Sequence, residues 1–466
     1  MSHSLNKQNL TLSEFLSYIQ KNFYLDLRSL ALFRVGLGLI ILQNLWSSIP
    51  YLDTFYGPNG LCPLSDPVIK KNLCYSLFAL GDSHLFLVSM ILVFAFFAVL
   101  LTLGLWTRAA TTACLVLHMS LLNRGPMYLN SGDMVLKIFL MWGLFLPLGQ
   151  VFSLDSRMSP KARPMPLRYA SAATVCLILQ IAVIYIENGF EKSDALWAPG
   201  YTAVHFALGL RDMAKPFAMV LLPHYNLLKV ASFLVLNLER YAFFLIALPF
   251  FPGLFRIFLI VAFTVFHVMI DLTLDVGWFS WVMLTGLSAL IPSVFWDFVR
   301  KKKTLEGQYH KKNNLLFLLF TLVLFQSIKQ SDLAPFSRKQ LPSPIQKVMS
   351  SLNFKQRWKM FAPKPPFLCY TVYIYPIYKK VEGCSYPSRM VPLEGKNFHR
   401  WIKYLWNFRE KKYKGLLYQK HLKAYLIREW NDKNPGKPIE DLEIIAKEEY
   451  YQIKTVGYYF TGWILL

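Results

Sequence analysis

Charged residues are scarce in this chain. Only 17% of its 466 residues are Asp, Glu, Lys or Arg, while 55% are hydrophobic and 16% aromatic. Soluble domains carry about a quarter charged residues. The low charge excludes an ordinary soluble domain over most of the length. Together with a mean hydropathy of +0.34, it predicts an integral membrane protein whose first partner is the lipid bilayer.

Signatures of common enzyme classes are also missing from the sequence. It holds no glycine-rich phosphate loop, no His-Glu-x-x-His, no Cys-x-x-Cys and no Gly-x-Ser-x-Gly. These absences argue against ATP use and predict no metal site. Six cysteines are too few for a disulfide scaffold of this length. Matched pairs of short or broken spans are lacking as well, which ranks a transporter last.

Apolar runs long enough to cross about 30 Å of hydrocarbon recur along the chain. The first contains Arg34 and lacks a small-residue cleavage site, so we expect a retained helix rather than a signal peptide. The predicted fold class is an all-α polytopic membrane bundle of about nine transmembrane helices. The expected spans are 29–50, 84–106, 108–123, 133–153, 168–190, 226–250, 254–275, 277–295 and 313–329.

Basic residues orient these spans. Dense clusters at 157–168 and 300–312 are separated by four spans, so both can face the cytoplasm. This arrangement places the N-terminal segment (1–28) in the cytoplasm and everything after the ninth span outside, in a bacterial inner membrane rather than the endoplasmic reticulum. Positive loops beside anionic lipid also explain the net charge of +23, so no nucleic-acid partner is expected.

Residues 330–466 differ in character from the membrane domain (29–329). Lys and Arg outnumber Asp and Glu there, and runs rich in Tyr, Val and Ile favour strands. We expect a small α+β extracytoplasmic domain that offers a surface to a peptide or protein partner. The cysteines of this domain and of the outside loops lie in a compartment that permits disulfides, so both a disulfide and free thiols remain alternatives. The expected strands are 368–378 and 450–466, and the expected helices are 398–413 and 416–431.

Ionisable side chains inside apolar spans are costly and usually have a role or a partner. Arg34 lies just inside its span, where a long basic side chain can reach the interface. Glu239 lies near mid-span, so we expect a structural ion pair with Lys or Arg. Lys192 follows the fifth span in a loop bounded by glycines. A desolvated lysine there can act as a base, but a lysine at a membrane boundary is more commonly one that snorkels.

Several segments of the chain together resemble a known family. They occur in the order and spacing of the horizontally transferred transmembrane family, also called the vitamin K-dependent γ-carboxylase-like family, over about residues 25–365. Each segment is weak by itself, and their order makes the resemblance specific. The segments are LALFRVGLG (30–38), LNSGD (129–133), FLPLG (145–149), FSLD (152–155), FHVM (266–269), GWFSWVML (277–284) and WKMFAP (358–363).

The resemblance implies roles for particular residues. The stretch GFEKSDALWAPGY (189–201) is similar to the family segment that holds a base lysine, and Lys192 falls on that lysine. It would deprotonate a hydroquinone similar to vitamin K. His267 falls on a histidine of a later segment and would share the catalytic role. Contacts with the quinol cofactor are expected from Trp197, Gly200 and Tyr201.

The chain also departs from the γ-glutamyl carboxylase. Leu148-Gly149-Gln150 stands where the carboxylase has an Asn-His pair, and Leu208 or a neighbour stands where it has an arginine. Cys62 lies near a carboxylase cysteine that forms a disulfide, but no matching downstream partner is found. These departures argue against carboxylation of glutamate in a substrate that carries a propeptide.

Two functions are compatible with the sequence. In the first, the protein is a membrane enzyme in which Lys192 deprotonates a hydroquinone at the outer face, so that a peptide or lipid is modified. In the second, it is a non-catalytic quinone-binding or assembly subunit of a membrane complex. The basic outer domain would then meet the other subunits.

Overall fold

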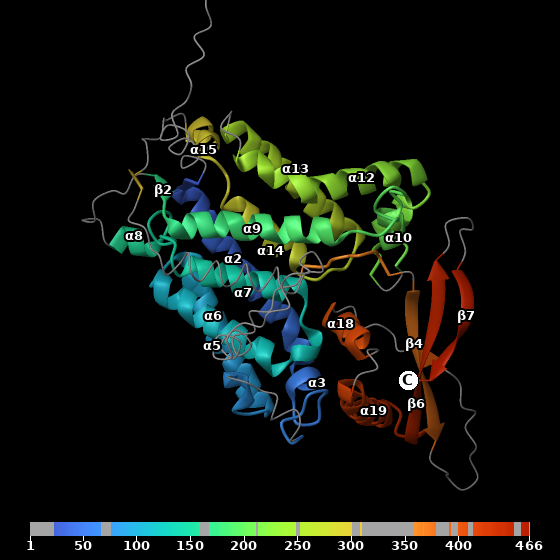
Figure 1. Ribbon diagram of the computed structural model, residues 1–466. Helices are drawn as coiled ribbons and strands as arrows, with labels where there is room; N and C mark the ends of the chain where they lie inside the picture. Colours follow the sequence, from blue (N-terminus) through green and yellow to red (C-terminus); the bar gives the residue numbers. More distant parts are fainter. Residues whose placement is uncertain are drawn as a thin grey trace, which may run out of the picture.

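The structure is a computed structural model in which a helical bundle is joined to a smaller domain built on a sheet (Figure 1). Most helices belong to the first two thirds of the chain, and the longest strands to the last third. The residues that the structure describes are 23–66, 76–158, 167–210, 213–247, 252–300, 308–309, 358–366, 368–378, 391–392, 399–408, 413–451 and 458–465.

A core of packed helices forms the first part of the bundle. Helix α2 packs on α5, α7 and α14, and α6 lies between α5 and α7. The Asp26 carboxylate caps α2 at the Arg28 amide, and Asn130 and Asp133 form a capping box at α7. The bounds are α2 (Leu27–Ser48), α3 (Leu52–Tyr56), α5 (His84–Leu103), α6 (Thr107–Arg124), α7 (Ser131–Gly143) and α14 (Phe279–Ser288).

A second group of helices carries the residues of interest. Helix α12 packs on α9 and α10, whereas α13 packs on α11 and α14. Large apolar side chains of α12 and α13 are exposed, among them Phe233, Phe258 and Val265, as expected where a helix faces lipid. The bounds are α9 (Ala172–Glu191), α10 (Ala203–Leu208), α11 (Pro216–Leu221), α12 (Tyr225–Tyr241), α13 (Pro252–Thr273) and α15 (Ser293–Arg300).

Four helices in the described part of the chain are long and apolar enough to cross a membrane. They are α2 continued by α3, then α5, α9 and α13, with the bent pair α14 and α15 as a fifth candidate at 79°. The expected nine spans are not confirmed. Helix α7 has only 13 residues and α12 only 17, and α6 carries three basic side chains. The expected span 313–329 lies outside the described residues.

A small sheet marks one end of the bundle. Strand β1 (Leu25–Asp26) pairs antiparallel with β2 (Arg168–Ala170), and β2 pairs parallel with β3 (Gln308–Tyr309). Helices α2 and α9 both start from this sheet and run away from it, α9 for about 30 Å. We call this the sheet end. Strands β2 and β3 each overlap one of the two densely basic stretches of the sequence, so the described parts of these stretches meet at one end of the bundle.

The C-terminal domain docks at the opposite end, which we call the far end. Its helix α18 packs on residues 126–128, and α19 covers β6. Tyr425 meets Thr54, and His421 meets Asp66 at 3.0 Å. The sheet order is β5-β4-β6-β7. The bounds are β4 (Leu368–Tyr378), β5 (Val391–Pro392), α18 (His399–Phe408), α19 (Tyr413–Lys433), β6 (Ile439–Tyr451) and β7 (Tyr458–Leu465).

Candidate functional site

A buried ion pair lies at the far end of α9. Lys192, the residue that ends α9, contacts the carboxylate of Glu239 in α12, and both side chains are 2–3% exposed. Asn188, one turn earlier, donates its Nδ2 to the other Glu239 oxygen at 2.9 Å. Lys192 therefore does not snorkel to the surface. The Glu239 carboxylate has the buried donors that a charged group in an apolar helix requires.

The end of α9 is held tightly against α12. Arg240 donates to the carbonyl oxygens of Gly189 and Lys192 at 2.8 and 2.7 Å. A Cβ atom at Gly189 would lie 2.8 Å from the Arg240 backbone nitrogen, so glycine permits the close approach. Burial lowers the pKa of Lys192, and the neighbouring Glu239 carboxylate opposes that shift.

The loop after α9 sets an aromatic ring beside the lysine. Trp197 is 2% exposed, and the Lys192 ammonium lies 4.7 Å from the ring centroid. Gly200 bonds to Ala195 within the loop, and the Tyr201 ring packs edge-on against Phe233. Of the three residues expected to touch a cofactor, Trp197 lines the large cavity beside Lys192, whereas Gly200 and Tyr201 do not line that cavity and shape the loop that carries Trp197.

A large apolar cavity, which we call the apolar chamber, opens beside the ion pair. Its volume is about 490 Å³, which is within the usual range for ligand sites. Its polar lining side chains among the described residues are Lys192, Glu239 and Thr273, and the Thr273 hydroxyl is bonded to the Met269 carbonyl. Leu234 and Phe258 line it and are more than half exposed, so the chamber opens between α12 and α13 toward the lipid-facing surface.

Residues 358–363, which we call the strap, close the chamber on its other side. Lys359 pairs with Glu191 at 2.5 Å, and the Phe361 carbonyl accepts a bond from the Trp197 indole at 2.9 Å. Phe361 has φ 56°, a left-handed conformation that is unusual for a bulky residue. The strap is the WKMFAP segment of the sequence, and its residues Met360 and Phe361 line the chamber together with Lys192.

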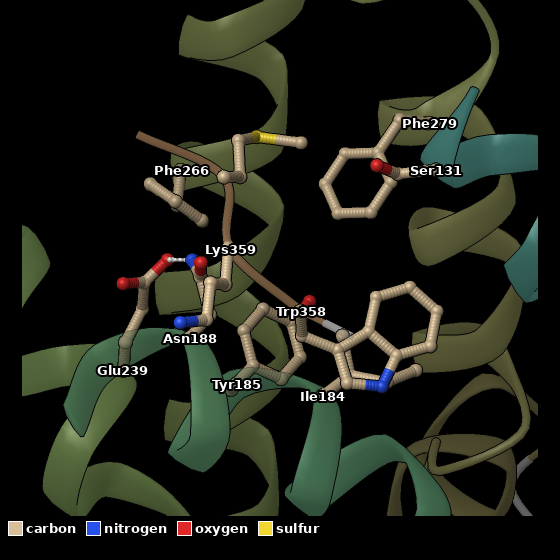
Figure 2. Close-up of a pocket in the computed structure, with 10 residues that line it drawn as sticks. Ser131, Ile184, Tyr185, Asn188, Glu239, Phe266, Phe279, Trp358 and Lys359 are labelled. Atoms are coloured by element: carbon tan, nitrogen blue, oxygen red, sulfur yellow. Dashed lines mark hydrogen bonds between the residues drawn. The ribbon is translucent and has the colours of Figure 1, made fainter. Parts of the chain in front are cut away.

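A second, small cavity also borders Glu239 and shares three lining residues with the chamber (Figure 2). Its volume is about 20 Å³, enough for one water molecule. Figure 2 shows Trp358 and Lys359 passing between Glu239 and Asn188 on one side and Ser131 and Phe279 on the other. Glu239 is the ionisable side chain that lines both this small cavity and the chamber.

His267 contacts the small cavity through a residue that lines it. Its Nε2 is 2.6 Å from the Tyr185 hydroxyl, and the histidine is fully buried. Tyr185 lines the small cavity, whereas His267 lines neither of the two cavities. The structure therefore brings Lys192 and Glu239 together. His267 is separated from the small cavity by Tyr185, to which it is bonded.

The other two predicted residues lie away from the chamber. Arg34 is 1% exposed and donates to the carbonyls of Leu148 and Phe152 at 2.9 and 2.6 Å, so it does not snorkel. Leu148-Gly149-Gln150 consequently lies near Arg34 and the sheet end rather than beside Lys192. Cys62 is a buried free thiol whose carbonyl accepts a bond from Arg124.

Several residues of the site escaped the sequence analysis. Asn188 and Tyr185 stand at α-helical spacing before Lys192, on the face of α9 that meets α12, and this spacing was the available signal. Nothing in the sequence indicated that Ser131 and Trp358 line one cavity, since 227 positions separate them. Within the described residues, no cluster of His, Cys, Asp and Glu could hold a metal ion.

The helices that build this site match a known domain. The HTTM domain model matches residues 24–296, which is more than half of the chain and runs from α2 into α15. Comparison with curated proteins and with solved structures found no match. The matched range contains Lys192, Glu239 and both helices of the lipid-facing opening, and it stops before the strap. The chain belongs to the HTTM family.

Proposed function

We propose that this membrane protein binds an amphiphile with an aromatic hydroxyl headgroup, such as an isoprenoid quinol, in the apolar chamber. The observation that supports this is the combination of a large apolar cavity with one buried ion pair at its end. An apolar tail would occupy the opening between α12 and α13, and the hydroxyl would meet Lys192 and Glu239. Pockets with an apolar lining and few polar groups select such ligands.

The proposed chemistry is removal of the hydroxyl proton. The ligand O–H bond breaks, the proton moves to the neutral amine of Lys192, and an aryl oxide anion remains. Burial favours the neutral amine because it lowers the pKa of Lys192, and Glu239 stabilises the ammonium that forms. The resemblance of 189–201 to the base-lysine segment of the carboxylase-like family agrees with this role. Modification of a peptide or lipid by the activated quinol would be the enzymatic outcome.

The alternative function is binding without chemistry, as in a quinone-binding or assembly subunit. The Lys192–Glu239 ion pair favours it, because a lysine held by a carboxylate is stabilised in its charged form. The charged amine would then donate a hydrogen bond to a quinone carbonyl rather than remove a proton. The two functions share one site and differ in the protonation of the bound ligand.

We infer the membrane orientation from the two ends of the bundle. The described parts of the two basic stretches lie at the sheet end, which favours a cytoplasmic sheet end and N-terminus. The far end, with the strap and the C-terminal domain, would then face outward in a bacterial inner membrane. Nine crossings satisfy this arrangement if α6, α7 and α12 are shorter crossings and 313–329 supplies the last. A reporter fused to the C-terminus and found in the cytoplasm would overturn it.

A tailed naphthol whose absorbance changes on ionisation tests the proposed site. We expect purified protein in detergent to bind the naphthol and to hold a fraction of it as naphtholate at neutral pH. Lys192→Met should abolish the naphtholate band. Lys215→Met is the matched control, because Lys215 is also ion-paired but does not line the chamber.

The outcomes separate the hypotheses. A naphtholate band that depends on Lys192 supports the base function. Binding with no naphtholate in the wild-type protein supports the non-catalytic alternative. If the naphthol does not bind, or if Lys192→Met and Lys215→Met behave alike in both binding and ionisation, the chamber is not the site and the proposal is wrong.

A further inference from the structure

Two compartments of different character meet at Glu239. The apolar chamber and the small cavity share Glu239, Phe266 and Met360 as lining residues, and of these only Glu239 can exchange a proton. Lys192 lines the chamber and is absent from the lining of the small cavity. A proton that leaves Lys192 away from the chamber therefore has the Glu239 carboxylate as its next acceptor.

The small cavity is polar on the side that faces Glu239. Asn188 is 8% exposed, and its Nδ2 is committed to Glu239, while its Oδ1 has no hydrogen-bond partner in the structure. The amide orientation is thus fixed, and Asn188, with this buried acceptor oxygen, lines a cavity with the volume of one water molecule. Tyr185, whose hydroxyl is also bonded to His267 Nε2, and Ser131 are further polar residues of the same lining. A water in this cavity has the two to four polar partners that a buried water requires.

The small cavity also leads outward at the far end. Ser131, which begins α7, is exposed, whereas Tyr185 and Asn188 are buried. Among the charged groups around the cavity, Lys359 lines it and is paired with Glu191, and Arg240 is bonded to the carbonyls of Gly189 and Lys192. The buried Glu187 carboxylate lies 3.5 Å from the Trp358 amide nitrogen. The cavity therefore lies between a buried carboxylate and an exposed hydroxyl.

We infer that the small cavity is a water site through which Glu239 exchanges protons with the aqueous phase at the far end. The inference rests on the proposed function. After Lys192 has taken the ligand proton, the ammonium N–H bond breaks and the proton moves to the Glu239 carboxylate. The carboxylic acid then releases it to the cavity water, which passes it to bulk water past Ser131. Lys192 returns to the neutral amine, Glu239 to the carboxylate, and the bulk gains one proton.

The kinetic role of this path is to return Lys192 to its neutral amine after each deprotonation of the ligand. The chamber is apolar and opens toward lipid, so it supplies no acceptor for a second proton. Without a route through Glu239, Lys192 would deprotonate one ligand molecule and then stay charged. Blocking the small cavity should therefore slow proton exchange while leaving ligand affinity unchanged.

A pH jump on the protein–naphthol complex tests this path. In stopped flow, the bound naphthol reports its ionisation by absorbance. We expect Ser131→Ile, which fills the exposed mouth of the cavity, to slow the approach to the new ionisation equilibrium by about a hundredfold, at the lower bound of what positioned proton transfer contributes. The naphthol Kd and the final naphtholate fraction should not change. Ser89→Ile is the matched control and should keep the wild-type rate, because Ser89 is also an exposed serine on a helix but does not line the small cavity.

A second variant covers the case in which Ser131→Ile fails to fold. Tyr185→Phe removes one hydroxyl from the cavity lining and should slow the same exchange and alter its solvent deuterium isotope effect. Unchanged exchange rates in a folded variant with the wild-type Kd would overturn the water path and leave the proposed function standing. Absence of Lys192-dependent ionisation in the wild-type protein would instead overturn the proposed function itself.

Discussion

Two buried ion pairs lie at the far end of the molecule, and they have opposite surroundings. In the first, Lys192 meets Glu239 beside two cavities. In the second, Arg400 of α18 reaches into the bundle and meets Asp133 at 3.3 Å. All four side chains are 1–3% exposed. Burial and charge are therefore the same in both pairs, and they cannot by themselves distinguish a reactive site from a structural one.

The surroundings of the second pair are closed. Arg400 also donates to the Asn44 side chain at 3.1 Å, and its neighbour Trp401 packs against Phe55 and Tyr404. Neither partner of this pair lines the chamber or the small cavity. The difference indicates that the Arg400 pair anchors the C-terminal domain, whereas the Lys192 pair is open to a ligand.

The largest expected effect tests the anchoring role. Arg400→Leu leaves the Asp133 charge buried without its partner, which costs about 3–5 kcal/mol in comparable sites. We expect the free energy of unfolding in detergent to fall by that amount. Lys433→Leu is the control, because the Lys433–Glu429 pair is an exposed i,i+4 pair and should cost only about 0.3–0.5 kcal/mol. Equal effects for both variants would show that Arg400 is not an anchor.

A smaller effect separates the two pairs by their response to ligand. At a naphthol concentration of about 100 Kd, a ligand that binds only the folded protein stabilises it by about 2.7 kcal/mol. This increment should persist in Arg400→Leu, because neither member of that pair lines the chamber. It should be reduced in Glu239→Gln, which removes the charge that faces the ligand hydroxyl. If instead Arg400→Leu loses the increment and Glu239→Gln keeps it, the assignment of the two pairs is reversed.

Some of the fold could be predicted from sequence, and the limits follow from packing. The apolar runs identified α2, α5, α9 and α13 as candidate spans, and the strand expected at 368–378 coincides with β4. Strand β6 was missed in large part, because Glu and Lys interrupt its apolar residues and mask its alternation. The count of nine spans was not confirmed, since local hydropathy cannot show that α7 ends after 13 residues in a turn.

The site could be predicted in part for a similar reason. Glu239 needed a donor because of its place in an apolar run, and Lys192 stood out by its position after a span. Their pairing depends on α12 folding back along α9 over 47 residues, and no local pattern encodes that contact. The chamber is likewise a property of packed helices. The sequence therefore indicated which residues carry charge in the bundle but not which of them share a cavity.

The smallest expected effect concerns the strap, which forms part of the chamber wall beside the Lys192–Glu239 pair. Trp197→Phe keeps an aromatic ring over Lys192 but removes the indole N–H that binds the Phe361 carbonyl. Loss of one such bond costs about 0.5–1.5 kcal/mol, so the unfolding free energy should fall modestly. Trp106→Phe is the control, because Trp106 is 65% exposed at the sheet end and should have almost no effect.

The naphthol should also dissociate faster from Trp197→Phe, since the strap is the part of the chamber wall that the indole holds. If dissociation from Trp197→Phe matches the wild-type protein, the strap does not retain the ligand, and the chamber exchanges its occupant only through the opening between α12 and α13.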